Sequence, residues 1–93
     1  MNQVVLRGQL VCANADEMDA VARHLPGHIE LTRAEPGCLA FDVVRTSDPH
    51  VWQVDETFVD AAAFEAHQQR VAVSDWGIAT SGIERRYTVH GTG

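Results

Sequence analysis

The stretch RAEPGCLAFDVVR, residues 33–45, contains the sharpest change of pattern in the chain. Its polar first part ends in Pro36-Gly37, which stops a helix because proline cannot continue the helical hydrogen bonds. An alternating run follows at once, and its apolar side is expected to enter the core through Leu39, Phe41 and Val43. The stretch therefore predicts the end of a helix and a strand that begins at about Cys38.

The residues before this stretch predict a strand and a helix. Apolar and mixed sides alternate from Val4 to Cys12, as in a strand that is buried on one side. Asn14 or Asp16 can cap the following helix. The apolar stripe of that helix consists of Met18, Val21, Ala22 and Leu25. Pro26-Gly27 is expected to break or kink it, with a second helical piece continuing to about Ala34.

The residues after the stretch predict three further main elements. They are a strand at 51–58 after a turn at 46–50, a helix capped by Asp60, and a strand at about 83–90, with a short helical turn at 74–80 before it. The end of the chain, about residues 88–93, is expected to be a flexible tail.

This order, β-α-β-β-α-β, predicts an α+β fold in one domain that spans residues 1–93. The economical solution is a ferredoxin-like sandwich, a four-stranded antiparallel sheet with both helices on one face. The third strand then lies between the first and the second. The other face, with Gln53, Asp55 and Thr57, is left bare, and a second subunit is expected to cover it.

Composition narrows the classes of partner. The formal charge of −6, with no lysine-rich run, argues against binding to nucleic acid. No apolar run approaches the ~20 residues that span a bilayer, and the first ten residues lack the pattern of a signal peptide. With only two cysteines, a cytoplasmic location is the expected one.

Residues 32–67, TRAEPGCLAFDVVRTSDPHVWQVDETFVDAAAFEAH, resemble the central signature of antibiotic biosynthesis monooxygenase domains. The shared pattern is Glu-Pro-Gly-Cys before a strand, an aromatic residue followed by an acidic one, and an Asp-Pro turn. Glu-x-aromatic-x-Asp and then Ala-His on a helix complete it. The resemblance implies a homodimeric α+β barrel, in which two ferredoxin-like subunits pack sheet against sheet.

The resemblance also implies an activity. Characterised members of this family oxidise quinols or phenolic polyketide intermediates with molecular oxygen, without metal, flavin or haem. The expected function is therefore a cofactor-independent monooxygenase that acts on a quinol or polycyclic phenol. The alternative is a non-redox dimeric barrel, because one fold hosts many chemistries. Such a barrel could be similar to a polyketide cyclase or dehydratase. It could also be a module that binds a small aromatic ligand, or a structural module.

Two residues are candidates for proton transfer. His67, at the Ala-His position, has the pKa range of a general base near neutral pH. Glu56 shares a strand face with Trp52, Val54 and Phe58, and a carboxylate on such a face needs a partner or a raised pKa. A hydrogen bond between Glu56 and His67 is expected to form the polar end of a pocket, although the pair could equally be structural.

Aromatic side chains are candidates for the walls of that pocket, because planar substrates favour them. They are Trp76, Trp52, Phe41, Phe64 and Tyr87. Each could instead be an ordinary core residue. Trp76 lies in the glycine-containing segment SDWGIATSG, residues 74–82, which could act as a lid.

No metal site is expected. His24 and His28 are four residues apart, but Pro26-Gly27 between them is expected to spoil helical geometry, and no third ligand is evident. Cys38 is expected to be a small, unreactive residue at the start of a strand. Arg7 and Arg45 are expected to pair with acidic groups across the dimer face or to contact an anionic substrate.

Overall fold

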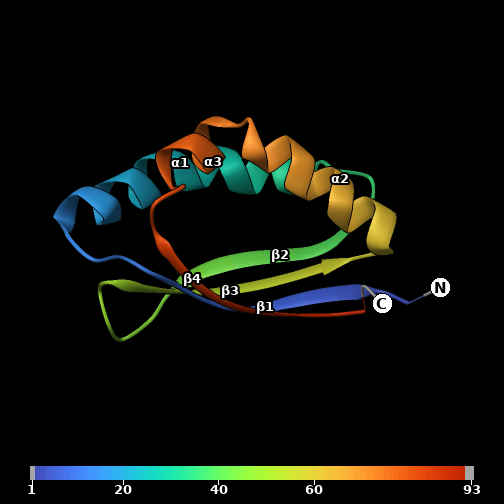
Figure 1. Cartoon of the computed structure of the whole chain (residues 1–93), viewed down its shortest axis with the longest axis horizontal. Helices are drawn as coiled ribbons and strands as arrows, with labels where there is room; N and C mark the ends of the chain where they lie inside the picture. The colour runs from blue at the N-terminus through green and yellow to red at the C-terminus, as the bar shows by residue number, and fades with distance from the viewer. Residues whose placement is uncertain (1, 92–93) are drawn as a thin grey trace.

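Four antiparallel strands form one sheet, covered on one face by helices (Figure 1). The computed structural model describes residues 2–91. The strands are β1 (Val4–Val11), β2 (Cys38–Arg45), β3 (Val51–Phe58) and β4 (Glu84–His90), and the helices are α1 (Ala15–Arg33), α2 (Ala61–Ala72) and α3 (Asp75–Ala79). The order in the sheet is β2-β3-β1-β4. The predicted ferredoxin-like α+β fold, with β3 between β1 and β2, is confirmed.

The helix α1 is continuous, and the predicted break at Pro26-Gly27 is wrong. Asn14 caps the helix by accepting the backbone N–H of Glu17 at 2.9 Å. Pro26 is exposed, and a proline inside a helix removes one hydrogen bond and crowds the carbonyl four residues before it, at a cost of about 3 kcal/mol. The buried stripe continues on both sides of it through Val21, Leu25, His28 and Thr32. Packing of this stripe outweighs the local cost, because tertiary contacts supply most helical stability in proteins.

The start of β2 departs from strict alternation. Leu39 is 52% exposed, so the prediction that it faces the core is wrong, whereas Phe41 and Val43 are buried. The pairing of β2 with β3 shifts register between Cys38 and Ala40, which marks a β-bulge. An extra residue in one strand displaces the alternation by one position. The sequence carries no strong local signal for such a bulge.

The turn before β2 is packed tightly against the start of α2. A side chain at Gly37 would overlap Ala63, so only a residue without a Cβ fits there. The backbone N–H of Val59 donates to the carbonyl of Gly37 at 2.8 Å. This close approach brings the neighbouring Glu35 toward α2.

The core lies between the sheet and the helices, and Leu10, Phe58 and Val21 are among its most buried side chains. At the C-terminal end, β4 continues to His90, which pairs with Val5. Residues 88–90, expected to belong to a flexible tail, are therefore part of the sheet, and residues 92–93 lie outside the described chain. Within residues 2–91, no helix has the length and apolar character needed to cross a membrane.

Candidate active site

A cavity of about 320 Å³ lies between the sheet and the three helices. Every element of the fold contributes to its wall. Five of the residues predicted for the site line it, namely Phe41 from β2, Glu56 from β3, His67 from α2, Trp76 from α3 and Tyr87 from β4. The structure therefore gathers these five residues, from distant parts of the chain, around one space.

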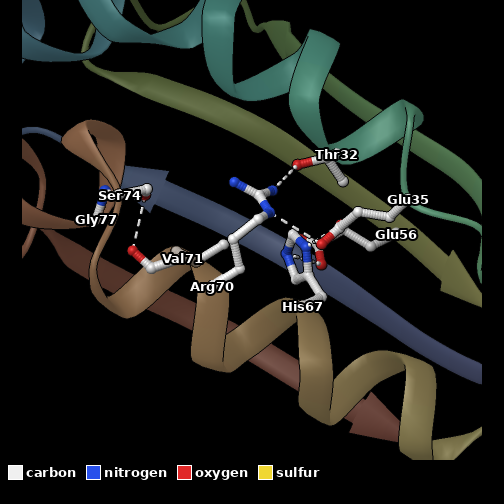
Figure 2. Close-up of polar contacts among 8 residues, drawn as sticks. All are labelled: Thr32, Glu35, Glu56, His67, Arg70, Val71, Ser74 and Gly77. Atoms are coloured by element: carbon white, nitrogen blue, oxygen red, sulfur yellow. Dashed lines mark hydrogen bonds and ion pairs between the residues drawn. The ribbon is translucent and has the colours of Figure 1, made fainter.

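His67 is buried and contacts a carboxylate on each side of its ring (Figure 2). Its Nδ1 lies 2.7 Å from Oε1 of Glu35, a short hydrogen bond. Its Nε2 lies 3.7 Å from Oε1 of Glu56, which is beyond hydrogen-bonding distance. The predicted hydrogen bond between Glu56 and His67 is therefore wrong in this structure, and Glu35 is the partner that the sequence analysis missed.

Glu35 is held in place by an arginine from α2. The Nε of Arg70 donates to Oε2 of Glu35 at 2.9 Å, and the Nη2 of Arg70 donates to the hydroxyl of Thr32 at 3.0 Å. Burial alone would raise the pKa of Glu35, but the hydrogen bonds from Arg70 and His67 hold it below its ordinary value. Glu35 is thus ionised at neutral pH and fixed in orientation.

The pKa of Glu56, in contrast to that of Glu35, is raised above its ordinary value. Its side chain is only 8% exposed, and its Oε1 has no hydrogen-bond partner within the described chain. Burial raises the pKa of Glu56 to about 7, and the negative charge of Glu35 adds to the rise. Burial also lowers the pKa of His67, against the opposing effect of Glu35. Near neutral pH, the carboxyl of Glu56 can therefore either hold or accept a proton beside a neutral imidazole.

His28 is a second buried histidine at the cavity, although the sequence pattern suggested it only as half of a metal pair with His24. Its ring stacks on Trp76 with centroids 4.6 Å apart and planes 3° apart. Burial, reinforced by His67 and Arg70, lowers the pKa of His28 to about 3, so the ring is neutral. The sequence contains a signal for the burial of His28. The apolar stripe that includes Val21 and Leu25 reaches His28 when the helix is continued through Pro26.

The segment that carries Trp76 is anchored to the end of α2. The hydroxyl of Ser74 accepts the N–H of Gly77 at 3.0 Å and donates to the carbonyl of Val71 at 2.8 Å (Figure 2). The hydroxyl of Thr80 donates to the carbonyl of Trp76 at 2.7 Å. These bonds fix the segment that places the indole of Trp76 in the wall of the cavity.

Two predicted wall residues lie outside the cavity. Trp52 is buried beneath the guanidinium of Arg45, whose Cζ lies 4.6 Å from the ring centroid. Phe64 packs on Phe58 with centroids 5.7 Å apart. Arg7 forms an ion pair of 3.5 Å with Asp55 within the same subunit. Within residues 2–91, no cluster of three or more His, Cys, Asp or Glu side chains is arranged to hold a metal ion.

Arg85 is a further cavity residue that the sequence analysis did not select. It donates to the carbonyl of Thr80 at 2.7 Å and to the hydroxyl of Thr80 at 2.8 Å. Beside it, burial raises the pKa of Tyr87 to about 12, so that this phenol stays neutral. Arg85 therefore brings a positive charge to the wall of the cavity that Glu56 also lines.

The fold and the site define a class of protein: a ferredoxin-like α+β domain with an aromatic cavity and a buried carboxyl–imidazole pair. A family model described as antibiotic biosynthesis monooxygenase matches residues 9–77. The chain belongs to that family, as its sequence signature predicted. A comparison with curated proteins found no significant match.

Solved structures share the fold at low identity. A candidate antibiotic biosynthesis monooxygenase from Nitrosomonas europaea superposes with a TM-score of 0.81 at 18% identity, covering 96% of this chain and 88% of that one. MupZ from Pseudomonas fluorescens gives 0.78 at 22%, covering 98% and 70%. SnoaB from Streptomyces nogalater, a cofactor-independent oxygenase, gives 0.78 at 10%, covering 96% and 91%. At these identities the likeness concerns the fold alone.

Proposed function

We propose that the protein is a cofactor-independent monooxygenase that oxidises a quinol or phenolic substrate with molecular oxygen. The observation that carries the proposal is the pair of Glu56 and His67 at one cavity with Phe41, Trp76 and Tyr87. An aromatic cavity suits a flat ring, and a group that titrates near pH 7 suits transfer of its hydroxyl proton. Membership of the family and the oxygenase named among the fold relatives support the same reaction.

The reaction needs no external electrons. For a quinol, one oxygen atom enters the ring, the other leaves as water, and the substrate loses two hydrogens, so that the substrate itself supplies the four electrons that reduce oxygen. Removal of the hydroxyl proton leaves an electron-rich anion that can pass one electron to oxygen. The resulting radical pair combines to a peroxide on a ring carbon. After that peroxide is protonated, its O–O bond breaks, the hydrogen on the same carbon is lost as a proton, and water leaves with a carbonyl remaining on the ring.

The chain's own residues handle the proton and the ring. In the proposal, Glu56 and His67 accept the hydroxyl proton and later return it to the peroxide oxygen. Phe41 and Trp76 bind the faces of the ring, and the bound ring displaces water from the cavity beside the anion. Arg85 lies on the same wall as Tyr87 and stabilises negative charge on the substrate.

The assembly we propose is a homodimer through the bare face of the sheet. The described chain places its helices on one face only (Figure 1). The other face carries Val44, which is 52% exposed, beside polar residues such as Gln53. Sedimentation equilibrium should give twice the chain mass, and Val44→Glu should shift the protein toward monomer. A wild-type monomer at all concentrations would refute the homodimer.

Oxygen consumption tests the activity. Chelator-treated protein is mixed with a panel of hydroquinones and anthrones under ¹⁸O₂, and the product is analysed by mass spectrometry. We expect uptake of one labelled oxygen atom per product molecule, and a large loss of rate in His67→Ala. Turnover without label would instead indicate a non-redox cyclase or dehydratase, and an unchanged rate in His67→Ala would remove His67 from the mechanism.

A further inference from the structure

We propose that Glu35, held by Arg70, is a positioning residue that keeps the proton of neutral His67 on Nδ1 and leaves Nε2 free to accept a proton beside Glu56. The side chains form one row, Arg70, Glu35, His67 and Glu56, which runs from the helix layer to the cavity (Figure 2). The tautomer follows from the contacts of the folded chain alone. Only the identity of the proton donor, a substrate hydroxyl, rests on the proposed function.

The hydrogen bond between Glu35 and His67 has one workable direction. An ionised carboxylate can only accept hydrogen bonds, and Oε2 of Glu35 already accepts from Arg70 at 2.9 Å. Oε1 lies 2.7 Å from Nδ1 of His67, a distance typical of a charge-assisted bond. A lone pair on Nδ1 would face the negative charge at this distance, so Nδ1 must carry the hydrogen.

The other ring nitrogen is then an acceptor that points toward the cavity. A neutral imidazole with its hydrogen on Nδ1 presents a lone pair at Nε2. The nearest acidic group is Oε1 of Glu56 at 3.7 Å, and this oxygen has no other partner within residues 2–91. The two atoms need to approach to about 3.2 Å to form a hydrogen bond. The protonated carboxyl of Glu56 would then donate to His67.

This arrangement defines the path of the proton. When a substrate hydroxyl loses its proton to Glu56, the electron pair of the O–H bond stays on the substrate oxygen. Glu56 can pass the proton to Nε2 of His67, and the imidazolium that forms lies directly against the negative charge of Glu35. Later the proton returns by the same route to the peroxide oxygen, so no proton is gained or lost over the cycle.

Charged and titratable groups lie around His67 on several elements. They are Glu35 in the turn before β2, Arg70 on α2, Glu56 on β3 and His28 on α1, with Arg85 and Tyr87 on β4 lining the same cavity. Only Glu35 makes a hydrogen bond to the ring within the described chain. Removing its charge is therefore the substitution that should change the ring's protonation most directly.

Nuclear magnetic resonance of ¹⁵N-labelled protein tests the tautomer without any substrate. Long-range proton–nitrogen spectra distinguish a protonated Nδ1 from a protonated Nε2, and the signals of His67 are assigned by their loss in His67→Gln. In the wild type above pH 7 we expect the hydrogen on Nδ1. In Glu35→Gln the amide can donate to Nδ1, so we expect a shift toward Nε2–H and a fall in the midpoint of His67 titration by roughly one to three pH units.

A matched control and a second variant complete the experiment. Glu65→Gln removes the same charge from an exposed position on α2 and should leave both the tautomer and the midpoint unchanged. If Glu35→Gln fails to fold, Arg70→Gln is the substitute test, because it leaves Glu35 in place but removes the arginine that anchors it. In Arg70→Gln we expect both tautomers of His67 to be populated. A wild-type His67 with its hydrogen on Nε2, or an unchanged tautomer in Glu35→Gln, would overturn the proposal.

The outcome is separable from that of the proposed function. An Nδ1–H tautomer that depends on Glu35, without oxygen consumption on any substrate, would support the positioning role and reject the oxygenase. Oxygen consumption by a protein whose His67 tautomer does not change in Glu35→Gln would support the oxygenase and reject the positioning role. Where both hold, Glu35→Gln should lower kcat far more than it changes KM, because Glu35 does not line the cavity.

Discussion

Replacing Glu56 by glutamine should stabilise the protein at neutral and higher pH and leave its stability near pH 4 almost unchanged. Burial raises the pKa of Glu56 from its ordinary value of 4.5 to about 7. The folded state thus binds this proton more tightly than the unfolded state does, and the free energy of unfolding falls as the pH rises between these two values. At about 1.4 kcal/mol per pH unit, the total loss is about 3 kcal/mol.

The assay is urea denaturation of both proteins at a series of pH values from 4 to 8.5. Glutamine has nearly the shape of a protonated glutamate and cannot ionise, so the difference between the two proteins isolates Glu56. Above pH 8 the variant should be more stable by about 3 kcal/mol, and the difference should shrink as the pH approaches 4. His67 titrates in both proteins, so its effect on the free energy of unfolding largely cancels in the difference between them.

The control is Glu65→Gln, an exposed position on the same helix as His67, for which the stability difference should be small at every pH. A difference between the wild type and Glu56→Gln that does not vary with pH would refute the reasoning. A wild type that gains stability relative to the variant as the pH rises would also refute it, since an ionised Glu56 would then be well paired in the folded state.

The remaining predictions concern stability and can be checked by urea denaturation followed by circular dichroism. Gly8→Ala should cost about 1–3 kcal/mol, because a Cβ there would overlap the carbonyl of Arg86 on β4. Gly27→Ala, with open space around its Cβ position in α1, should instead add about 0.5–1 kcal/mol, and equal effects at both glycines would contradict this contrast. Asn14→Ala should cost about 1 kcal/mol through loss of the helix cap, and no measurable loss would show that the cap contributes little. Phe58→Ala should cost about 3–5 kcal/mol, because Phe58 is 1% exposed, and a loss below 1 kcal/mol would mean that the core closes around the gap.

Much of the fold could be predicted from local patterns. Alternation identified the strand from Val51 to Phe58, and the caps Asn14 and Asp60 marked the starts of both long helices. The errors occurred where tertiary packing overrides a local preference. Pro26 lies inside a continuous helix because the buried stripe on both sides of it is stabilised by the sheet.

The candidate site was predictable only in part. Glu56 stood out as a carboxylate on an apolar strand face, and His67 stood out at the Ala-His position of the family signature. Glu35 gave no such signal, since it lies in a polar turn where an acidic residue is ordinary. Its role depends on the bulge after Cys38 and on the close contact of Gly37 with Ala63, which together set the position of the turn against α2.

The order of the elements, the family and the chemical types of residue available to the site all follow from the amino-acid sequence. These depend on periodicity, caps and an ordered signature, which are properties of short segments. Which carboxylate bonds to His67 depends on packing in the folded chain, because residues 35 and 67 are separated by two strands in the sequence. RAEPGC, residues 33–38, therefore has two roles: it marks the fold in the sequence and it supplies the bonded carboxylate in the folded chain.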